Sequence, residues 1–209
     1  MAIRKFICHS YQVVSLAMGL GWLPGARYTN LRDVKKFDRL GFLDIDWNGY
    51  DYRKHLQTAK DTRPMITVAR DVVDIGELDR ILSEALELSQ WADIVVVVPK
   101  DLRLQPMLPH IIPEDFLLGY SVPTSYGGTE LPLSCFTPRK VHLLGGHPAK
   151  QRALGEQLMV ESIDCNRFTL DATFGDFFDG ETFRPHPLGG YKRCIKDSLF
   201  NINRLWEEY

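Results

Sequence analysis

The chain has 209 residues, and its 25 lysines and arginines against 27 aspartates and glutamates leave a formal net charge of −2 at pH 7. This balance excludes the uniformly basic surface of a histone-like protein, but it allows a local basic patch. Hydrophobic residues make up 44% of a chain long enough for a sizeable core, so we expect residues 1–209 to form a single domain.

Cysteine spacing and hydropathy argue against a zinc-binding, a membrane-spanning and a secreted protein. The four cysteines are widely separated and form no CxxC pair, which predicts reduced thiols in a cytosolic protein and no structural zinc. No apolar run reaches the ~18 residues of a membrane span, and the N-terminus is too polar for a signal peptide. We therefore expect a cytoplasmic protein without a metal, a cofactor or a membrane partner; its oligomeric state stays open.

The first half of the chain alternates strand-like and helix-like stretches. Residues 93–98 read DIVVVV, the composition of a parallel strand that is buried on both faces. After Asp74, a predicted N-cap, apolar residues recur at helical spacing. In chain order we predict strands over 3–8, 42–47, 64–69 and 93–98, and helices over 11–22 (closing in the glycine-rich stretch 19–25), 34–40, 50–62 and after Asp74.

The second half continues the alternation. We predict strands over 116–122, 141–144 and 159–163, a helix over 149–158, a further strand near 168–172 and a terminal helix over 201–209. Seven or eight strand–helix units predict an α/β fold, a small TIM-like (β/α)8 barrel with parallel strands and outer helices. Because roughly 250 residues is typical of that barrel, this one would be trimmed.

The stretch 140–166 forms one βαβ repeat with a distinctive end. Its first strand stops at Gly145 and Gly146, Pro148 can open the helix, and the second strand ends on Asp164. Loops after the carboxyl ends of barrel strands build active sites. Glycines there let the backbone approach a ligand closely, with the carboxylate of Asp164 beside them.

Acids recur at the predicted strand ends, at Asp44 or Asp46, Asp71 and Asp164. Any one of them alone is more typical of a turn or a helix cap. As a set they are more informative, because a barrel gathers its strand ends around one axis. Two carboxylates at one glycosidic carbon suit glycosyl transfer, with one as nucleophile and the other as acid and base.

Other side chains near strand ends are candidates for substrate contacts. Lys100 follows the strand 93–98 and could contact substrate or phosphate, while Tyr120 or Tyr126 could stack on a base. Their alternative roles are those of surface or loop residues. His142 lies within a strand, and we interpret it as a core residue.

A basic cluster lies near the C-terminus, where Lys192, Arg193 and Lys196 flank Tyr191. Such a cluster suits the phosphates of a nucleic acid. Its alternative role is an ordinary solvated helix face.

Four short motifs of this chain resemble the tRNA-guanine transglycosylase superfamily. HLLGG at 142–146 is similar to the family's glycine-rich loop that contacts the base, and SIDCN at 162–166 is similar to the motif of its nucleophile, which implies that role for Asp164. LDID at 43–46 resembles the family's first aspartate motif, which implies that Asp44 is the second carboxylate; because the family's Ser-Gly-Gly is absent, Asp46 stays an alternative. VARDV at 68–72 implies that Asp71 recognises the base.

The resemblance is closest to the shorter, phage-associated branch that places 7-deazaguanine derivatives into DNA. It covers residues 42–166 and includes the loop GYSVPTSYGGT, whereas the family's zinc-binding CxCxxC cluster is missing. The resemblance implies an enzyme, a pentosyltransferase that exchanges guanine for a 7-deazaguanine base through a covalent Asp-glycosyl intermediate. Its polymer would be DNA, with tRNA as the alternative, and a phage-encoded protein would work in the host cytoplasm.

Two alternative functions stay open. The same site could act as a DNA glycosylase, with water resolving the intermediate, or the chain could be a non-catalytic nucleotide-binding α/β protein. For the enzyme we expect catalysis by Asp164 and Asp44. The expected substrate contacts are Asp71, Gly145, Gly146, Lys100 and Tyr120, and the expected nucleic-acid contacts are Lys192, Arg193 and Lys196.

Overall fold

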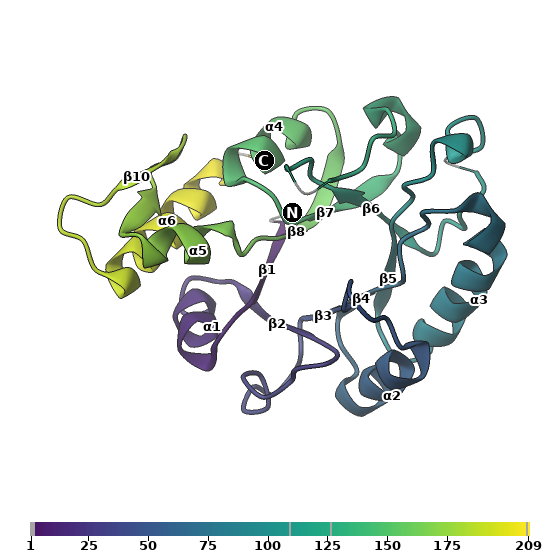
Figure 1. Ribbon diagram of the computed structural model, residues 1–209, viewed down its shortest axis with the longest axis horizontal. Helices are drawn as coiled ribbons and strands as arrows, with labels where there is room; N and C mark the ends of the chain where they lie inside the picture. Colours follow the sequence, from purple (N-terminus) through teal and green to yellow (C-terminus); the bar gives the residue numbers. More distant parts are fainter. Residues whose placement is uncertain (1–2, 109, 126, 208) are drawn as a thin grey trace.

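Parallel strands in this protein close into a barrel, as the computed structural model shows for residues 3–108, 110–125, 127–207 and 209 (Figure 1). Tyr126, one of the two predicted stacking residues, lies outside these described residues. Eight strands of the described chain follow one another in sequential order, and the last pairs in parallel with the first. The predicted TIM-like α/β barrel is thereby confirmed.

The barrel strands are short and match most of the predicted ones. They are β1 (Arg4–Cys8), β2 (Leu23–Arg27), β3 (Phe42–Asp44), β4 (Ile66–Val68), β5 (Ile94–Val97), β6 (Leu117–Ser121), β7 (Lys140–Leu144) and β8 (Met159–Asp164). The sequence reading missed β2, because Pro24 and Gly25 resemble turn residues. The glycine is required there, since a Cβ on Gly25 would lie 2.6 Å from the Sγ atom of Cys8 on β1.

Helices surround the barrel on its outer side (Figure 1). They are α1 (Tyr11–Met18), α2 (Tyr52–Thr62), α3 (Leu78–Leu88) and α4 (Pro148–Gly155), with 3-10 helices at Ile75–Glu77, Leu102–Leu104 and Leu133–Phe136. The helix predicted over 34–40 is wrong: Val34 and Phe37 each bond to the carbonyl three residues earlier, which makes successive turns.

After β8 the chain adds a C-terminal segment beside the barrel. It comprises α5 (Arg167–Thr173), the antiparallel strands β9 (Asp176–Phe178) and β10 (Phe183–Pro185), and α6 (Tyr191–Leu205). The strand predicted near 168–172 is therefore wrong, because this stretch forms α5. Phe168 and Ala172, four residues apart, bury one face of that helix. The terminal helix begins ten residues earlier than the expected 201, at Tyr191.

Side chains alternate between the inside of the barrel and the helix layer. The inward positions form an apolar cluster of Phe6, Phe42, Ile66, Val68, Val96, Val98, Leu117 and Leu144. The outward positions pack against the helices in a larger core. Asp44 and Asp164 fall on the inward alternation at the carboxyl ends of β3 and β8, so the apolar interior becomes acidic at this end.

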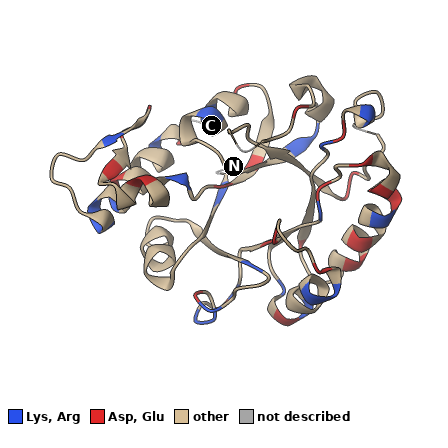
Figure 2. Ribbon diagram, in the orientation of Figure 1, with Lys and Arg blue, Asp and Glu red and all other residues tan. Residues whose placement is uncertain are grey.

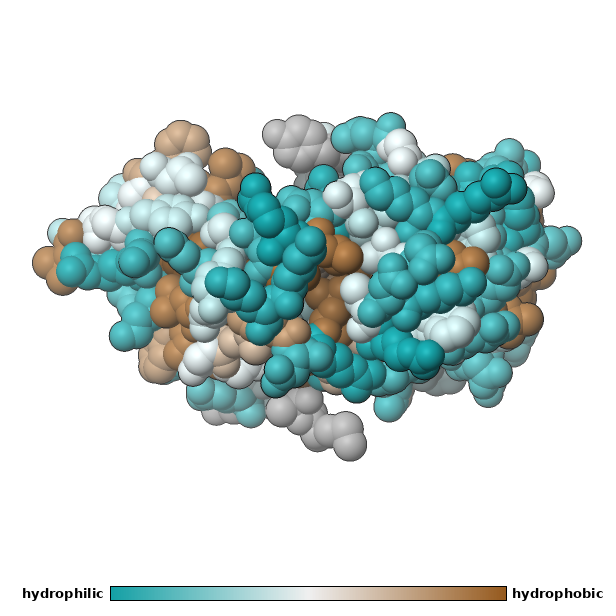
Figure 3. All heavy atoms as spheres, turned by 90° about the horizontal axis from the view of Figure 1, so that it is seen from below, coloured by the Kyte–Doolittle hydropathy of each residue, from teal (hydrophilic) through white to brown (hydrophobic). Residues whose placement is uncertain are grey.

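Charge is distributed unevenly around the barrel. Figure 2 shows several acidic residues along α3 and basic residues in the connection 28–41, whereas the C-terminal segment carries both signs of charge. The face in Figure 3 is mostly hydrophilic, with apolar atoms at its left end over that segment, where Phe174 is 77% and Leu188 75% exposed. Within the described residues, none of the helices has the length and apolar character that a bilayer crossing requires.

Candidate active site at the carboxyl ends of the strands

A cavity of about 590 Å³ opens at the carboxyl ends of the barrel strands. Most of the residues that line it come from strand ends or the loops that follow them, and they include Arg27, Asp44, Trp47, Lys100, Ser121, Gly145, Gly146, Asp164 and Asn166. An adjoining cavity of about 480 Å³ shares Arg27, Asp44 and Asn166 with it. Asp44 therefore borders both halves of the barrel mouth.

Asp164 is held at the end of β8 by the turn after β7. The backbone N–H of Gly145 donates to Asp164 Oδ1 at 3.0 Å. Below this contact the wholly buried Gln151 donates from Nε2 to the carbonyl oxygens of Gly145 and Asp164, both at 2.8 Å. Gln151, which sequence reasoning missed, thus ties the glycine turn to the end of β8 and sets where the carboxylate lies.

Gly145 and Gly146 both have positive φ, of 60° and 87°. A Cβ on Gly146 would lie 2.5 Å from Val122 Cγ1, whereas a Cβ on Gly145 would meet nothing within 4 Å. The turn therefore needs glycine for its backbone conformation at both positions and for space at the second.

Gly146→Ala should accordingly lower the free energy of unfolding by about 2–4 kcal/mol, through the left-handed backbone and the clash with Val122. Gly145→Ala, the matched control, should cost only about 1–2 kcal/mol, because it meets the backbone penalty alone. Urea denaturation of both variants measures the difference. Equal losses would show that Val122 gives way without cost.

Asp44 has the electrostatics of a proton-transfer group. Burial and the neighbouring charge of Asp164 raise its pKa to about 7, against the opposing effects of the Ile45 N–H and Arg27. Asp46 lies further along the loop, where it accepts from Thr29 Oγ1 and the Asn48 N–H, both at 3.3 Å. Of these two aspartates the structure places Asp44 at the cavity.

Two cysteines lie close to the carboxylates. Burial, with Asp44 and Asp164 nearby, raises the pKa of the Cys8 thiol well above its ordinary value. Burial also raises the pKa of Cys165 to about 12. Both side chains are thiols at neutral pH, and thiols are poor nucleophiles. Asp164 is thus a better candidate nucleophile than either neighbour.

Asp71 and Lys100 form an ion pair beside the cavity, with Lys100 Nζ 2.6 Å from Asp71 Oδ2. Burial raises the pKa of Asp71 to about 6 even though Lys100 opposes the shift. Of this pair, Lys100 lines the cavity, whereas Asp71 is absent from the described lining residues. Lys100, expected as a substrate contact, thus has access to a ligand, while Asp71 lies behind it.

Trp47 is a lining residue that sequence reasoning missed. The residue is 46% exposed, and Lys100 Nζ lies 5.1 Å from the centroid of its ring. An exposed aromatic ring at a cavity can stack on a planar ligand. Its place directly after the LDID motif was the signal that could have revealed it.

Tyr120 does not reach the cavity, which corrects its expected role as a substrate contact. It is buried between the barrel and the outer layer, in edge-to-face contact with Phe136 at a centroid distance of 5.1 Å. Alternation along β6 turns Tyr120 outward and the next residue, Ser121, inward to line the cavity.

The basic cluster lies at the start of α6, across a groove from α1. This groove has a volume of about 930 Å³, and Lys192, Arg193 and Lys196 line it together with Tyr11 and Tyr191. Arg193 also donates to the carbonyl oxygens of Leu188 and Gly189, at 3.0 and 3.2 Å. Ser10 lines both this groove and the smaller mouth cavity, so the two surfaces adjoin.

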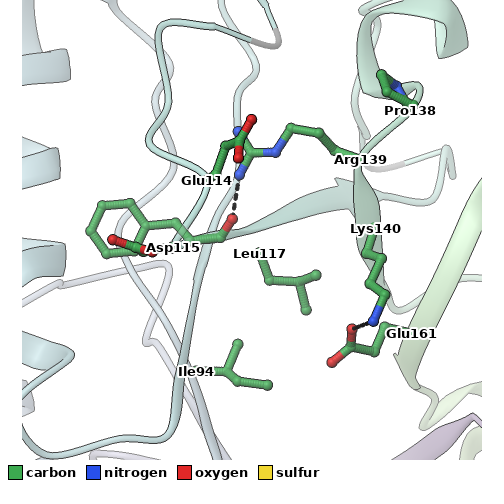
Figure 4. A pocket seen from close by; sticks show the side chains of 9 residues that line it. Ile94, Glu114, Asp115, Leu117, Pro138, Arg139, Lys140 and Glu161 are labelled. Atoms are coloured by element: carbon green, nitrogen blue, oxygen red, sulfur yellow. Dashed lines mark hydrogen bonds and ion pairs between the residues drawn. The ribbon is translucent and has the colours of Figure 1, made fainter.

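The opposite end of the barrel has a cavity of about 400 Å³, shown in Figure 4. The basic side chains of this cavity, Arg139 and Lys140, are bonded to other groups of the protein. Lys140 Nζ lies 3.0 Å from Glu161, and Arg139 donates to the carbonyl oxygens of Ile112, Pro113 and Phe116. Since this face of such barrels serves stability, we place the candidate active site at the other end.

Among the described residues, no group of three or more histidines, cysteines, aspartates or glutamates is arranged to hold a metal ion. The expected absence of zinc stays a prediction. Residues 17–207 match the model of DUF6610, a family of unknown function. None of the curated proteins matches the sequence.

Proposed function

The chain belongs to the DUF6610 family of unknown function, and we propose that it is a nucleic-acid base transglycosylase that exchanges guanine for a 7-deazaguanine derivative in DNA. The convergence of Asp164 and Asp44 on one cavity supports this function most strongly. The two carboxyl groups differ in the way that the chemistry needs. Asp164 is oriented by a backbone N–H, and Asp44 has a pKa of about 7.

In the first step a carboxylate oxygen of Asp164 attacks C1′ of the target nucleotide. The C1′–N9 bond breaks, its electron pair passes to N9, and protonated Asp44 supplies the proton of the leaving guanine. A pKa of about 7 makes Asp44 an effective acid at neutral pH. The product is a covalent glycosyl ester of Asp164.

In the second step Asp44, now a carboxylate, takes a proton from N9 of the incoming 7-deazaguanine base. N9 then attacks C1′, the ester bond to Asp164 breaks, and the Asp164 carboxylate is restored. The proton taken up by Asp44 replaces the one it gave, so both side chains return to their initial states.

The side of the cavity formed by Trp47 and Lys100 suits the base. The Trp47 ring can stack on a purine-like ring, and Lys100, charge-compensated by Asp71, can donate to a carbonyl oxygen of the base. The positive-φ turn at Gly145 and Gly146 lets backbone approach the base edge. Because the site is recessed, the target nucleotide has to leave the base stack.

The groove between α1 and α6 suits the phosphates of the polymer, because Lys192, Arg193 and Lys196 line it next to the barrel mouth. The double variant Lys192→Ala/Lys196→Ala should weaken DNA binding and reduce the slope of log K against log salt concentration by about 2. Fluorescence anisotropy over a salt series measures this.

The matched control for this prediction is Arg53→Ala/Lys54→Ala, which removes two exposed charges from α2, away from the groove (Figure 1). An unchanged salt slope in the groove variant, or equal changes in both variants, would place the DNA elsewhere.

The function itself is tested by incubating the protein with labelled duplex DNA or tRNA, with and without free 7-deazaguanine bases. Guanine release that requires the free base supports exchange on the polymer that reacts. Release with an abasic product and no free base indicates the glycosylase alternative. Binding of either polymer without guanine release would leave the non-catalytic binding protein.

A further inference from the structure

A histidine lies inside the barrel directly beneath the proposed nucleophile. His142 on β7 is wholly buried, and its ring is stacked on Phe42 at a centroid distance of 5.1 Å. Nδ1 lies 2.7 Å from Ser162 Oγ, and Nε2 lies 3.4 Å from Asp164 Oδ1. Among the described residues Nε2 has no hydrogen-bond partner of good geometry, so Asp164 is the group it faces.

A carboxylate at Asp164 favours a proton on Nε2 of His142, either in the neutral ring or in the doubly protonated imidazolium. If Nδ1 carried the proton, it would donate to Ser162 and turn the lone pair of Nε2 toward the negative oxygen of Asp164. If Nε2 carries the proton, its positive end faces that oxygen across 3.4 Å, and in the neutral ring the hydroxyl of Ser162 donates to Nδ1. A proton on Nε2 thus avoids the repulsion between a lone pair and the carboxylate, which is costly in an apolar interior.

We propose that His142 is a positioning residue that, with a proton kept on Nε2 by the facing carboxylate, holds Asp164 from below. Together with the Gly145 N–H, which donates to the same oxygen at 3.0 Å, it leaves Oδ2 of Asp164 as the attacking atom. This role of His142 rests on the proposed function of Asp164. The contact between His142 and Asp164 is a feature of the structure and does not depend on that function.

A functional test compares two variants of equal burial. His142→Phe keeps a flat ring against Phe42 but has no donor, whereas the amide nitrogen of His142→Gln reaches the position of Nε2. We expect His142→Phe to lower kcat for guanine release by about 10²-fold with little change in KM, the scale of one lost donor. His142→Gln should recover most of that loss. Equal losses in two folded variants, or no loss in either, would overturn the role.

A second test does not depend on activity. The ¹⁵N chemical shifts of the His142 ring distinguish the two neutral tautomers, and both can be recorded on the full chain at neutral pH. We expect a proton on Nε2 in the native protein and in Ser162→Ala, where Asp164 still faces Nε2, and a shift toward Nδ1 protonation in Asp164→Ala, where Ser162 remains the acceptor. A neutral ring with its proton on Nδ1 in the native protein would overturn the inference. This result is informative even if no base exchange is found.

Discussion

Asp164→Asn should abolish base exchange, lowering kcat by roughly 10⁴–10⁶-fold, the scale seen when a covalent nucleophile is removed. Asparagine keeps the shape of the side chain and can still accept from the Gly145 N–H, which in the native protein donates to Asp164 Oδ1 at 3.0 Å. Its neutral amide cannot form the glycosyl ester. The two nearby cysteines cannot take over, because burial keeps them as thiols. Single-turnover release of labelled guanine measures the loss.

The control for this variant is Asp115→Asn, at the cavity on the opposite end of the barrel (Figure 4). It removes the same charge from an exposed position and should leave guanine release unchanged. Circular dichroism and urea denaturation establish that both variants fold. Native activity in a folded Asp164→Asn protein would refute the proposed nucleophile.

Asp44→Asn should slow guanine release by about 10²–10⁴-fold, the usual contribution of a general acid or base. In the native protein, release should fall as pH rises through about 7, because Asp44 then loses the proton that the leaving guanine needs. The variant should lack this fall. Single-turnover rates between pH 5 and pH 9 measure both effects, and an identical pH profile in the two proteins would exclude Asp44 as the acid.

The same raised pKa makes a prediction for stability. The folded state holds a proton on Asp44 up to about pH 7, whereas the unfolded chain releases it near the ordinary value of 3.8. Stability from this group is therefore lost as pH rises through that window. Asp44→Asn should stabilise the protein more at pH 8 than at pH 5, by about 2–3 kcal/mol in the difference.

Much of the barrel could be predicted from sequence because its strands are apolar and its helices amphipathic. Those signals are local, and they marked seven of the eight strands close to their positions in the structure. β2 was not predicted, because its glycine looks like a turn residue in the sequence. Gly25 is needed there because it packs against Cys8 of the neighbouring strand β1. The hairpin of β9 and β10 and the full length of α6 were not predicted, because these elements are buried by contacts with each other and with α5.

The candidate site likewise contains residues that could be predicted from the sequence and residues that could not. Asp164, Gly145 and Gly146 lie at an abrupt strand end that the sequence displays, and the structure places them on one cavity. Whether a strand side chain points into or out of the barrel is harder to predict from the sequence, because an error of one residue in the position of the strand reverses the direction. Because side chains alternate along a strand, Tyr120 points away from the cavity and Ser121 lines it. The same alternation directs His142, which we expected to be an ordinary core residue, toward Asp164.

Covalent trapping tests the central claim most directly. The protein is incubated with a guanine-containing DNA oligonucleotide, quenched in denaturant, and analysed by intact mass spectrometry and peptide mapping. We predict an adduct on the peptide that contains Asp164, discharged when a 7-deazaguanine base is added before the quench and lost in Asp164→Asn. Guanine release without an adduct, or an adduct on another residue, would contradict the proposed mechanism.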